Sequence, residues 1–204
     1  LRLAAMELAG TSPTGQGIKR VEDAITAVVQ AEIAAQAANA HVRFGMAPKG
    51  YGLVTLHRPS NVDDPERLGA LLTLVRELST ALPLVFPVHP RTRAAAVKAG
   101  LGGLLDGSPR LRCVEPLPYL DNLSLMAGSR VVFTDSGGMQ EETTALDVPC
   151  LTLRENTERP ITLELGTSRL VGNDPGRIRQ AFGEVMDGRW PHARPIPLWD
   201  GRTA

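Results

Sequence analysis

Beyond residue 50, short apolar runs alternate with longer stretches that carry apolar residues on one face. The short runs do not alternate apolar with polar residues, which is typical of strands buried on both faces of a parallel sheet. We expect strands near residues 51–56, 84–88, 111–114, 130–134, 149–153 and 168–171. Helices are expected near residues 64–81, 91–99, 119–127, 137–146, 159–165 and 174–187. This order predicts an α/β fold with a Rossmann-like parallel sheet and helices on both of its faces.

Two of the expected helices carry clear start signals. Asp64 and Asp174 each precede a proline, so a capping carboxylate is followed by a residue with a helical φ angle. Ligands of open parallel sheets bind beyond the carboxyl ends of the strands, and the loops there are where a site is expected.

The first 50 residues differ from the rest because they are rich in alanine. Apolar residues spaced three and four apart predict one amphipathic helix from about residue 21 to 39, which is expected to pack against a neighbour. We therefore divide the chain into a helical segment, 1–50, and a Rossmann-like domain, 51–204.

Composition narrows the class of protein. The chain has 204 residues and a formal charge of zero, which gives no indication of a nucleic acid or a membrane surface as partner. Cys113 and Cys150 lie in apolar stretches, which favours reduced, buried thiols over disulfides or a metal site. No apolar run is long enough to span a bilayer and no signal peptide opens the sequence, so the cytoplasm is the expected location.

The strongest local signal lies at residues 133–142, where an apolar strand is followed by Ser136, Gly137 and Gly138 at the start of a helix. Glycine allows the backbone to approach a bulky group, and free amides of a first helical turn attract phosphate oxygens. A tight turn in which serine or aspartate caps the helix is the alternative interpretation. One turn further, Glu142 can accept hydrogen bonds from two ribose hydroxyl groups, whereas Glu141 is expected to face solvent.

Histidines and arginines follow the other strand ends. His57 and Arg58 follow the first expected strand, His89 follows the second, and Arg154 and Arg159 lie in a polar loop after a later one. Histidine can transfer a proton near neutral pH, and an arginine fork matches phosphate geometry. A satisfied structural histidine and a surface ion pair are the alternatives at these positions.

Four segments together resemble the C-terminal half of the non-hydrolysing UDP-N-acetylglucosamine 2-epimerases. These are TLHRPSNVDDPERL at 55–68, FPVHPRTR at 86–93, TDSGGMQEE at 134–142 and LRENTERP at 153–160. LVGNDPGRI at 170–178 and PLWDG at 197–201 also fit. The resemblance implies one half of a GT-B-like two-domain fold, in which the substrate lies between two Rossmann-like halves.

The resemblance also implies an activity and its partners. The family interconverts UDP-N-acetylglucosamine and UDP-N-acetylmannosamine by eliminating UDP and adding it back, through a 2-acetamidoglucal, without a nicotinamide cofactor or a metal. A homodimer and a role in cell-surface polysaccharide biosynthesis are further implications.

Site roles follow from the matching motifs. Ser136, Gly137 and Gly138 would bind the diphosphate, Glu142 the ribose and Arg159 the phosphate or sugar region. His57 would be a catalytic histidine close to the reacting sugar. In bacterial members the histidine that matches His89 binds a regulatory second substrate molecule, which makes His89 an allosteric candidate.

Two departures from the family pattern remain. At the position that contacts uracil, where the family often has an aromatic residue, this sequence has Asn122. No counterpart of the N-terminal half, which supplies the acid and base carboxylates, is found in residues 1–50. We therefore expect a fragment, with 1–50 as a remnant of that half or a connection to it. A GT-B glycosyltransferase domain and an inactive UDP-binding fragment are the alternative functions.

Overall fold

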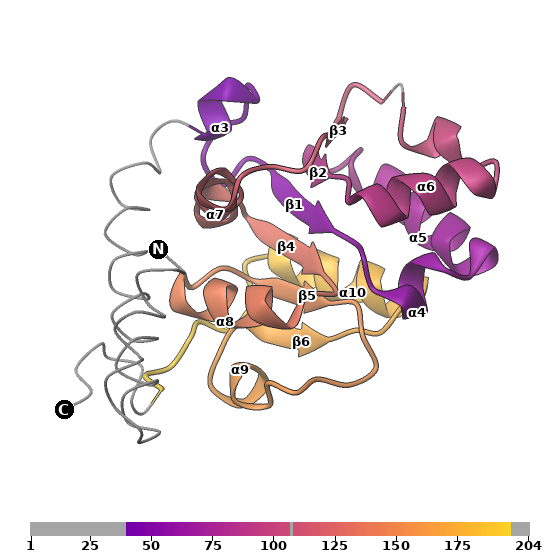
Figure 1. Ribbon diagram of the computed structural model, residues 1–204. Coiled ribbons are helices and arrows are strands. Elements are labelled where there is room, and N and C mark those ends of the chain that lie inside the picture. The colour runs from indigo at the N-terminus through magenta and orange to yellow at the C-terminus, as the bar shows by residue number, and fades with distance from the viewer. Residues whose placement is uncertain (1–39, 107, 197–204) are drawn as a thin grey trace, which may run out of the picture.

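The described part of the chain forms one six-stranded parallel sheet between two layers of helices (Figure 1). The computed structural model describes residues 40–106 and 108–196. The helix expected at 21–39 and the PLWDG segment lie outside the described residues.

The strands agree closely with the expected positions. In chain order they are β1 (Gly52–Thr55), β2 (Leu84–Pro87), β3 (Leu111–Val114), β4 (Val131–Thr134), β5 (Cys150–Thr152) and β6 (Ser168–Leu170). Their order in the sheet is β3-β2-β1-β4-β5-β6, and every neighbouring pair is parallel. The prediction of a Rossmann-like parallel sheet is therefore confirmed.

The longer helices also match the expectation. They are α5 (Pro65–Leu78), α6 (Pro90–Lys98), α7 (Tyr119–Gly128), α8 (Gly137–Ala145) and α10 (Pro175–Met186). Asp64 accepts hydrogen bonds from the amides of Glu66 and Arg67, and Asp174 accepts one from the amide of Arg177, so both expected caps are confirmed.

The short elements differ from the expectation. The helix expected at 159–165 is the four-residue α9 (Ile161–Glu164). Neither α4 (Pro59–Val62) nor the 3-10 turn η1 (Gly102–Leu104) was predicted. The described residues before β1 belong to the packed domain, because α3 (Ala40–Arg43) contacts α7 and Ala40 is buried.

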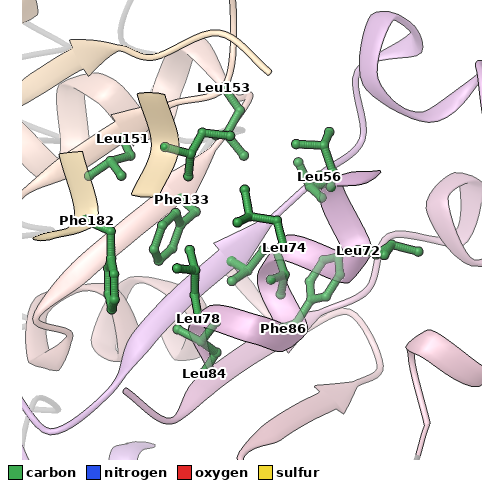
Figure 2. Packing of buried hydrophobic residues seen from close by; sticks show 14 of the residues in the cluster. Leu56, Leu72, Leu74, Leu78, Leu84, Phe86, Phe133, Leu151, Leu153 and Phe182 are labelled. Carbon is green, nitrogen blue, oxygen red and sulfur yellow. The ribbon is translucent and has the colours of Figure 1, made fainter. Parts of the chain in front are cut away.

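Both faces of the sheet are buried, each against its own apolar cluster. On one face Phe86, Phe133 and Leu151 pack against α5 and α10, as Figure 2 shows for Leu74, Leu78 and Phe182 among others. On the other face a second cluster joins the sheet to α7 and α8, and its members include Leu53, Val85, Val132, Leu125, Met126 and Met139. Burial on both faces explains why the strands show no alternation of apolar and polar residues.

The strand order places a switch point between β1 and β4. From β1 the chain continues outward to β2 and β3, and it then returns to β4 on the other side of β1. Loops that follow β1 and β4 therefore diverge to opposite sides, and they leave room for a ligand at the carboxyl edge of the sheet.

Two expectations from composition can be compared with the structure. None of the helices in the described part of the chain combines the length and apolar character that a bilayer span requires. Cys113 and Cys150 are free thiols. Cys150 is fully buried as expected, whereas Cys113 is only half-buried, and burial raises the pKa of its thiol to about 11.

Candidate functional site

A buried carboxylate joins the ends of β1 and β4. Asp135, the residue after β4, is completely buried and accepts hydrogen bonds from the backbone amides of His57 and Arg58, at 3.0 and 2.9 Å for its Oδ2. The side-chain amide of Asn61 donates to the same oxygen at 3.2 Å. These donors satisfy the carboxylate and fix the first loop against the second.

The same carboxylate orients the imidazole of His57. Nδ1 of His57 lies 2.9 Å from Oδ1 of Asp135, and about a third of the histidine side chain is exposed. An ionised carboxylate accepts, so Nδ1 carries a proton and Nε2 is the nitrogen left for a ligand. The site therefore presents a histidine in one defined orientation at the switch point.

Ionisation of Asp135 is favoured despite its burial. Burial alone would raise the pKa of this carboxyl group, but hydrogen bonds from the His57 imidazole and from the amides of Arg58 and His57 outweigh burial and lower it. The carboxylate is therefore charged at neutral pH, and it accepts a hydrogen bond from Nδ1 of His57.

The first turn of α8 is not capped by a side chain. Ser136 occupies the N-cap position with extended backbone angles, and its hydroxyl group makes no capping hydrogen bond. Asp135 points to His57 instead. The interpretation of residues 135–138 as a turn capped by Ser136 or Asp135 is therefore wrong. The amide of Ser136 donates to Oγ1 of Thr134 at 3.0 Å, and the amides of the helical turn that follows are the ones that can donate to a ligand.

The loop after β5 lies against this helix start. A methyl group placed on Gly137 would lie 2.7 Å from Oε1 of Glu158 and 3.8 Å from Nη1 of Arg154. Arg154 and Glu158 form an ion pair at 2.8 Å, and Nη2 of Arg58 lies 3.7 Å from the same glutamate. Glu158 and Arg154 therefore lie at the glycine turn, and the guanidinium group of Arg58 lies next to Glu158.

A buried amide holds that loop in place. Oε1 of Gln140, on α8, accepts hydrogen bonds from the hydroxyl groups of Thr157 at 2.8 Å and Thr162 at 3.4 Å. Gln140 is completely buried, and Thr157 in turn accepts from the amide of Arg159. The position of the loop relative to α8 is thus set by an internal network.

Glu142 lies one helical turn beyond the glycines and is bound to an aromatic residue. The hydroxyl group of Tyr119, at the start of α7, donates to Oε1 of Glu142 at 3.1 Å. Burial raises the pKa of Glu142, a shift that the tyrosine hydrogen bond partly offsets. Tyr119 is half-exposed, and Asn122 lies one turn further along the same helix.

Two expected site residues have additional partners. The ring of His89 lies 5.6 Å from that of His57, and its Nδ1 accepts a hydrogen bond from the amide of Arg91 as the cap of α6. Nε of Arg159 lies 3.0 Å from Oε1 of Glu141 on α8. His89 is therefore close to the site, whereas the side chain of Arg159 is paired with Glu141 on α8.

An open pocket of about 390 Å³ continues the site behind the two guanidinium groups. Residues that follow β1, β5 and β6 line it together with one residue of α5, among them Arg58, Asn61, Arg67, Arg154 and Asn173. No group of three or more histidine, cysteine, aspartate or glutamate side chains within the described ranges is arranged to hold a metal ion.

Three residues of the candidate site were not predicted from the sequence. Asp135 was considered only as a helix cap, and Tyr119 and Glu158 were assigned no role. A signal existed for Asp135, because it is the first residue after a central strand. Pairing of Tyr119 with Glu142 and of Glu158 with two arginines depends on helix and loop packing, which short motifs do not encode.

A doubly wound parallel sheet with a polar site at its switch point defines a Rossmann-like α/β domain of the GT-B-like class. A family model described as UDP-N-acetylglucosamine 2-epimerase matches residues 17–204. The chain belongs to this family.

Individual relatives agree with the family assignment. The UDP-N-acetylglucosamine 2-epimerase of Methanococcus maripaludis is 43% identical over 157 residues, covering 75% of this chain and 42% of that protein. The Bacillus subtilis enzyme of the same name is 35% identical over 191 residues, covering 86% and 49%. The crystal structure of the Methanocaldococcus jannaschii UDP-GlcNAc 2-epimerase with UDP-GlcNAc and UDP has a TM-score of 0.69 and 34% identity, covering 79% and 46%. The chain spans less than half the length of these relatives.

Proposed function

We propose that this chain supplies the UDP-binding half of a non-hydrolysing UDP-N-acetylglucosamine 2-epimerase. The observation that carries the proposal is the convergence of His57, Asp135 and the uncapped start of α8 at one switch point. The crystal structure of the M. jannaschii relative in complex with UDP-GlcNAc and UDP supports the choice of ligand.

In this proposal the diphosphate binds at the glycine turn. Amides at the start of α8 would donate to its oxygens, with Ser136, Gly137 and Gly138 allowing close approach. Breaking the bond between C1 and the leaving oxygen places negative charge on the departing diphosphate. Preorganised amides and nearby arginines lower the barrier because they meet that charge as it develops.

The remaining contacts follow the length of the nucleotide sugar. Glu142 would accept hydrogen bonds from the ribose, Asn122 would lie near the base, and Arg159 would bind the phosphate or sugar region. Because Tyr119 and Asn122 lie on the same helix beyond Glu142, the base would reach the start of α7.

His57 would act close to the leaving group. Its Nδ1 is held by Asp135, so Nε2 can donate a proton or a hydrogen bond to the leaving oxygen and accept the proton back when UDP is re-added. The carboxylates that exchange the C2 proton would come from outside this chain. No cofactor or metal is required in this scheme.

Several properties of the whole enzyme belong to the same proposal. These are a cytoplasmic location, a homodimeric state and a role in cell-surface polysaccharide biosynthesis. His89 is the candidate for a regulatory contact with a second substrate molecule, because its ring lies beside that of His57.

The proposal is tested by calorimetric titration of the chain with UDP. We expect weak, measurable binding, and a lower affinity for Arg159→Ala, because one cation of the site is removed. Arg189→Ala is the matched control, since that arginine pairs with Asp187 at the end of α10. Absence of UDP binding by the folded chain would contradict the proposed ligand.

Activity is tested on a protein that spans the full length of the relatives and contains these residues. In deuterated water with UDP-N-acetylglucosamine, we expect exchange of the C2 proton and formation of UDP-N-acetylmannosamine. The chain described here should produce neither. A full-length protein that lacks both exchange and epimerisation would refute the reaction even if UDP binds.

A further inference from the structure

One carboxylate lies beside the proposed diphosphate site. Oε1 of Glu158 would lie 2.7 Å from a methyl group placed on Gly137, the first residue of α8. The space in front of the glycine turn is therefore not open to solvent alone. A negatively charged side chain of the protein lies beside it.

The same carboxylate is paired with the arginines of the site. Oε2 of Glu158 lies 2.8 Å from Nη2 of Arg154, and Oε1 lies 3.7 Å from Nη2 of Arg58. Hydrogen bonds and charge from Arg154, with a contribution from Arg58, hold the pKa of Glu158 at about 2. The carboxylate is ionised throughout the neutral range.

The backbone at Glu158 is held in place, whereas its side chain is free to move. The loop is anchored because Thr157, the preceding residue, is bound to the buried Gln140. About half of the Glu158 side chain is exposed, so its carboxylate can turn toward solvent without moving the loop. Arg154 is much less exposed, at 15%, and would remain where it is.

We propose that Arg154 and Arg58 form the phosphate clamp of this site and that Glu158 is their exchangeable internal counter-anion, displaced when a nucleoside diphosphate binds. This inference rests on the proposed function and adds the regulation of its binding site. It assigns the principal cationic role to Arg154, whose guanidinium group lies at the glycine turn, in addition to Arg159.

Displacement has a simple electrostatic basis. A diphosphate beside a retained Glu158 carboxylate would be repelled by it, and both anions would compete for the same guanidinium donors. Turning Glu158 into solvent removes the repulsion but costs its ion pairs. In the free site, Glu158 keeps both arginines paired. Because these ion pairs must be broken on binding, the affinity for the diphosphate is reduced.

Titration of the whole chain with UDP tests this inference, using Glu158→Gln and Glu155→Gln. Both changes remove one negative charge from the same loop, but Glu155 lies against Gly172 rather than Gly137. Because an exposed ion pair contributes little to stability and is readily given up, Glu158→Gln should lower the Kd for UDP by only about fivefold. Glu155→Gln should change the Kd by less than about twofold, because only a general change in charge acts there.

Arg154→Ala completes the set, and it should raise the Kd for UDP. Equal or weaker binding by Glu158→Gln, or equal gains in both glutamine variants, would overturn the inference while leaving the proposed function intact. Circular dichroism identifies any variant that fails to fold, and Glu158→Asp then replaces Glu158→Gln, with a gain in affinity again expected from its shorter reach.

A second measurement separates the inference from the ligand assignment. Carboxyl ¹³C shifts should show that saturation with UDP raises the pKa of Glu158 toward its ordinary value, because the ion pairs are lost. A pKa that stays near 2 in the bound state would refute displacement. If neither the parent chain nor Glu158→Gln binds UDP or inorganic pyrophosphate, the proposed function and the inference both fail.

Discussion

At the scale of single residues, Asp135 determines which nitrogen of His57 faces a ligand. The carboxylate has no exposure, and it accepts from the imidazole, from two backbone amides and from Asn61. A neutral amide at this position could accept from some of these donors, but its own NH₂ group would meet the others. The role of Asp135 is therefore both structural and chemical.

We expect Asp135→Asn to destabilise the chain by about 2–5 kcal/mol, because buried donors lose an ionised acceptor. Urea unfolding measures the change. Asp63→Asn is the matched control, since its ion pair with Arg91 is half-exposed and should contribute less than about 1 kcal/mol. Similar losses in both variants would contradict the role assigned to the buried carboxylate.

The same substitution has a pH signature. The folded pKa of Asp135 lies below its ordinary value of 3.8, so its contribution to stability is present above that value. It is lost as the pH falls through the folded pKa. As the pH falls below about 4, the unfolding free energy of the parent should therefore decrease more steeply than that of Asp135→Asn.

Tyr119 is expected to contribute to binding of the base. Burial, and then the neighbouring Glu142 carboxylate, raise the pKa of its phenol to about 12, so the hydroxyl group remains a donor and holds the ring beside Glu142. Because stacking on an aromatic ring contributes about 1–3 kcal/mol per base, Tyr119→Leu should weaken UDP binding roughly tenfold.

Tyr119→Phe is the control for this prediction, because it retains the ring and should lose much less affinity. Inorganic pyrophosphate, which has no base, should bind the parent and Tyr119→Leu equally well. A matching loss for pyrophosphate would show that the substitution disturbs the glycine turn instead of the base.

Sequence position alone was sufficient to place His57, Ser136 and Arg154 at one edge of the sheet. Each follows an apolar run that could only be a buried strand. The side chains that pair with these residues could not be predicted from sequence position. Which loop acid reaches which arginine depends on side-chain packing, and so Glu158 was found only in the structure.

At the scale of elements, burial on both faces made the strands predictable. Six apolar runs correspond to six strands, because each is covered by helices on either side. The four-residue helices α4 and α9 are too short to show a 3.6-residue period, and their positions depend on local turn geometry.

Two glycines in and near helices should respond in opposite directions to alanine. A methyl group on Gly183, inside α10, would meet no atom within 4 Å, so Gly183→Ala should stabilise the domain by about 0.5–1 kcal/mol. A methyl group on Gly166 would lie 2.6 Å from the carbonyl oxygen of Thr162. Gly166→Ala should therefore destabilise it by about 1–3 kcal/mol.

Thermal unfolding of the two variants tests this prediction. Gly183→Ala should raise the melting temperature, and Gly166→Ala should lower it. A loss of stability in Gly183→Ala would mean that α10 is not a regular helix at that point.

At the scale of the whole molecule, the site forms one edge of the domain and has no covering wall among the described residues. The chain spans less than half the length of its relatives. The described residues therefore carry the proposed nucleotide site, whereas the groups for the proposed proton transfer at C2 are not among them.

The alignment of β1 with β4 has a consequence for how the protein folds. Thr55 pairs with Thr134, and only this register brings His57 to Asp135, which lies 78 positions later in the chain. A slip by one residue would turn every side chain of a strand to the opposite face. Such distant pairings form late, because a long loop must close first. During refolding, the chain would then regain nucleotide binding only after β1 and β4 have paired. Recovery of binding would therefore report correct refolding of the central sheet.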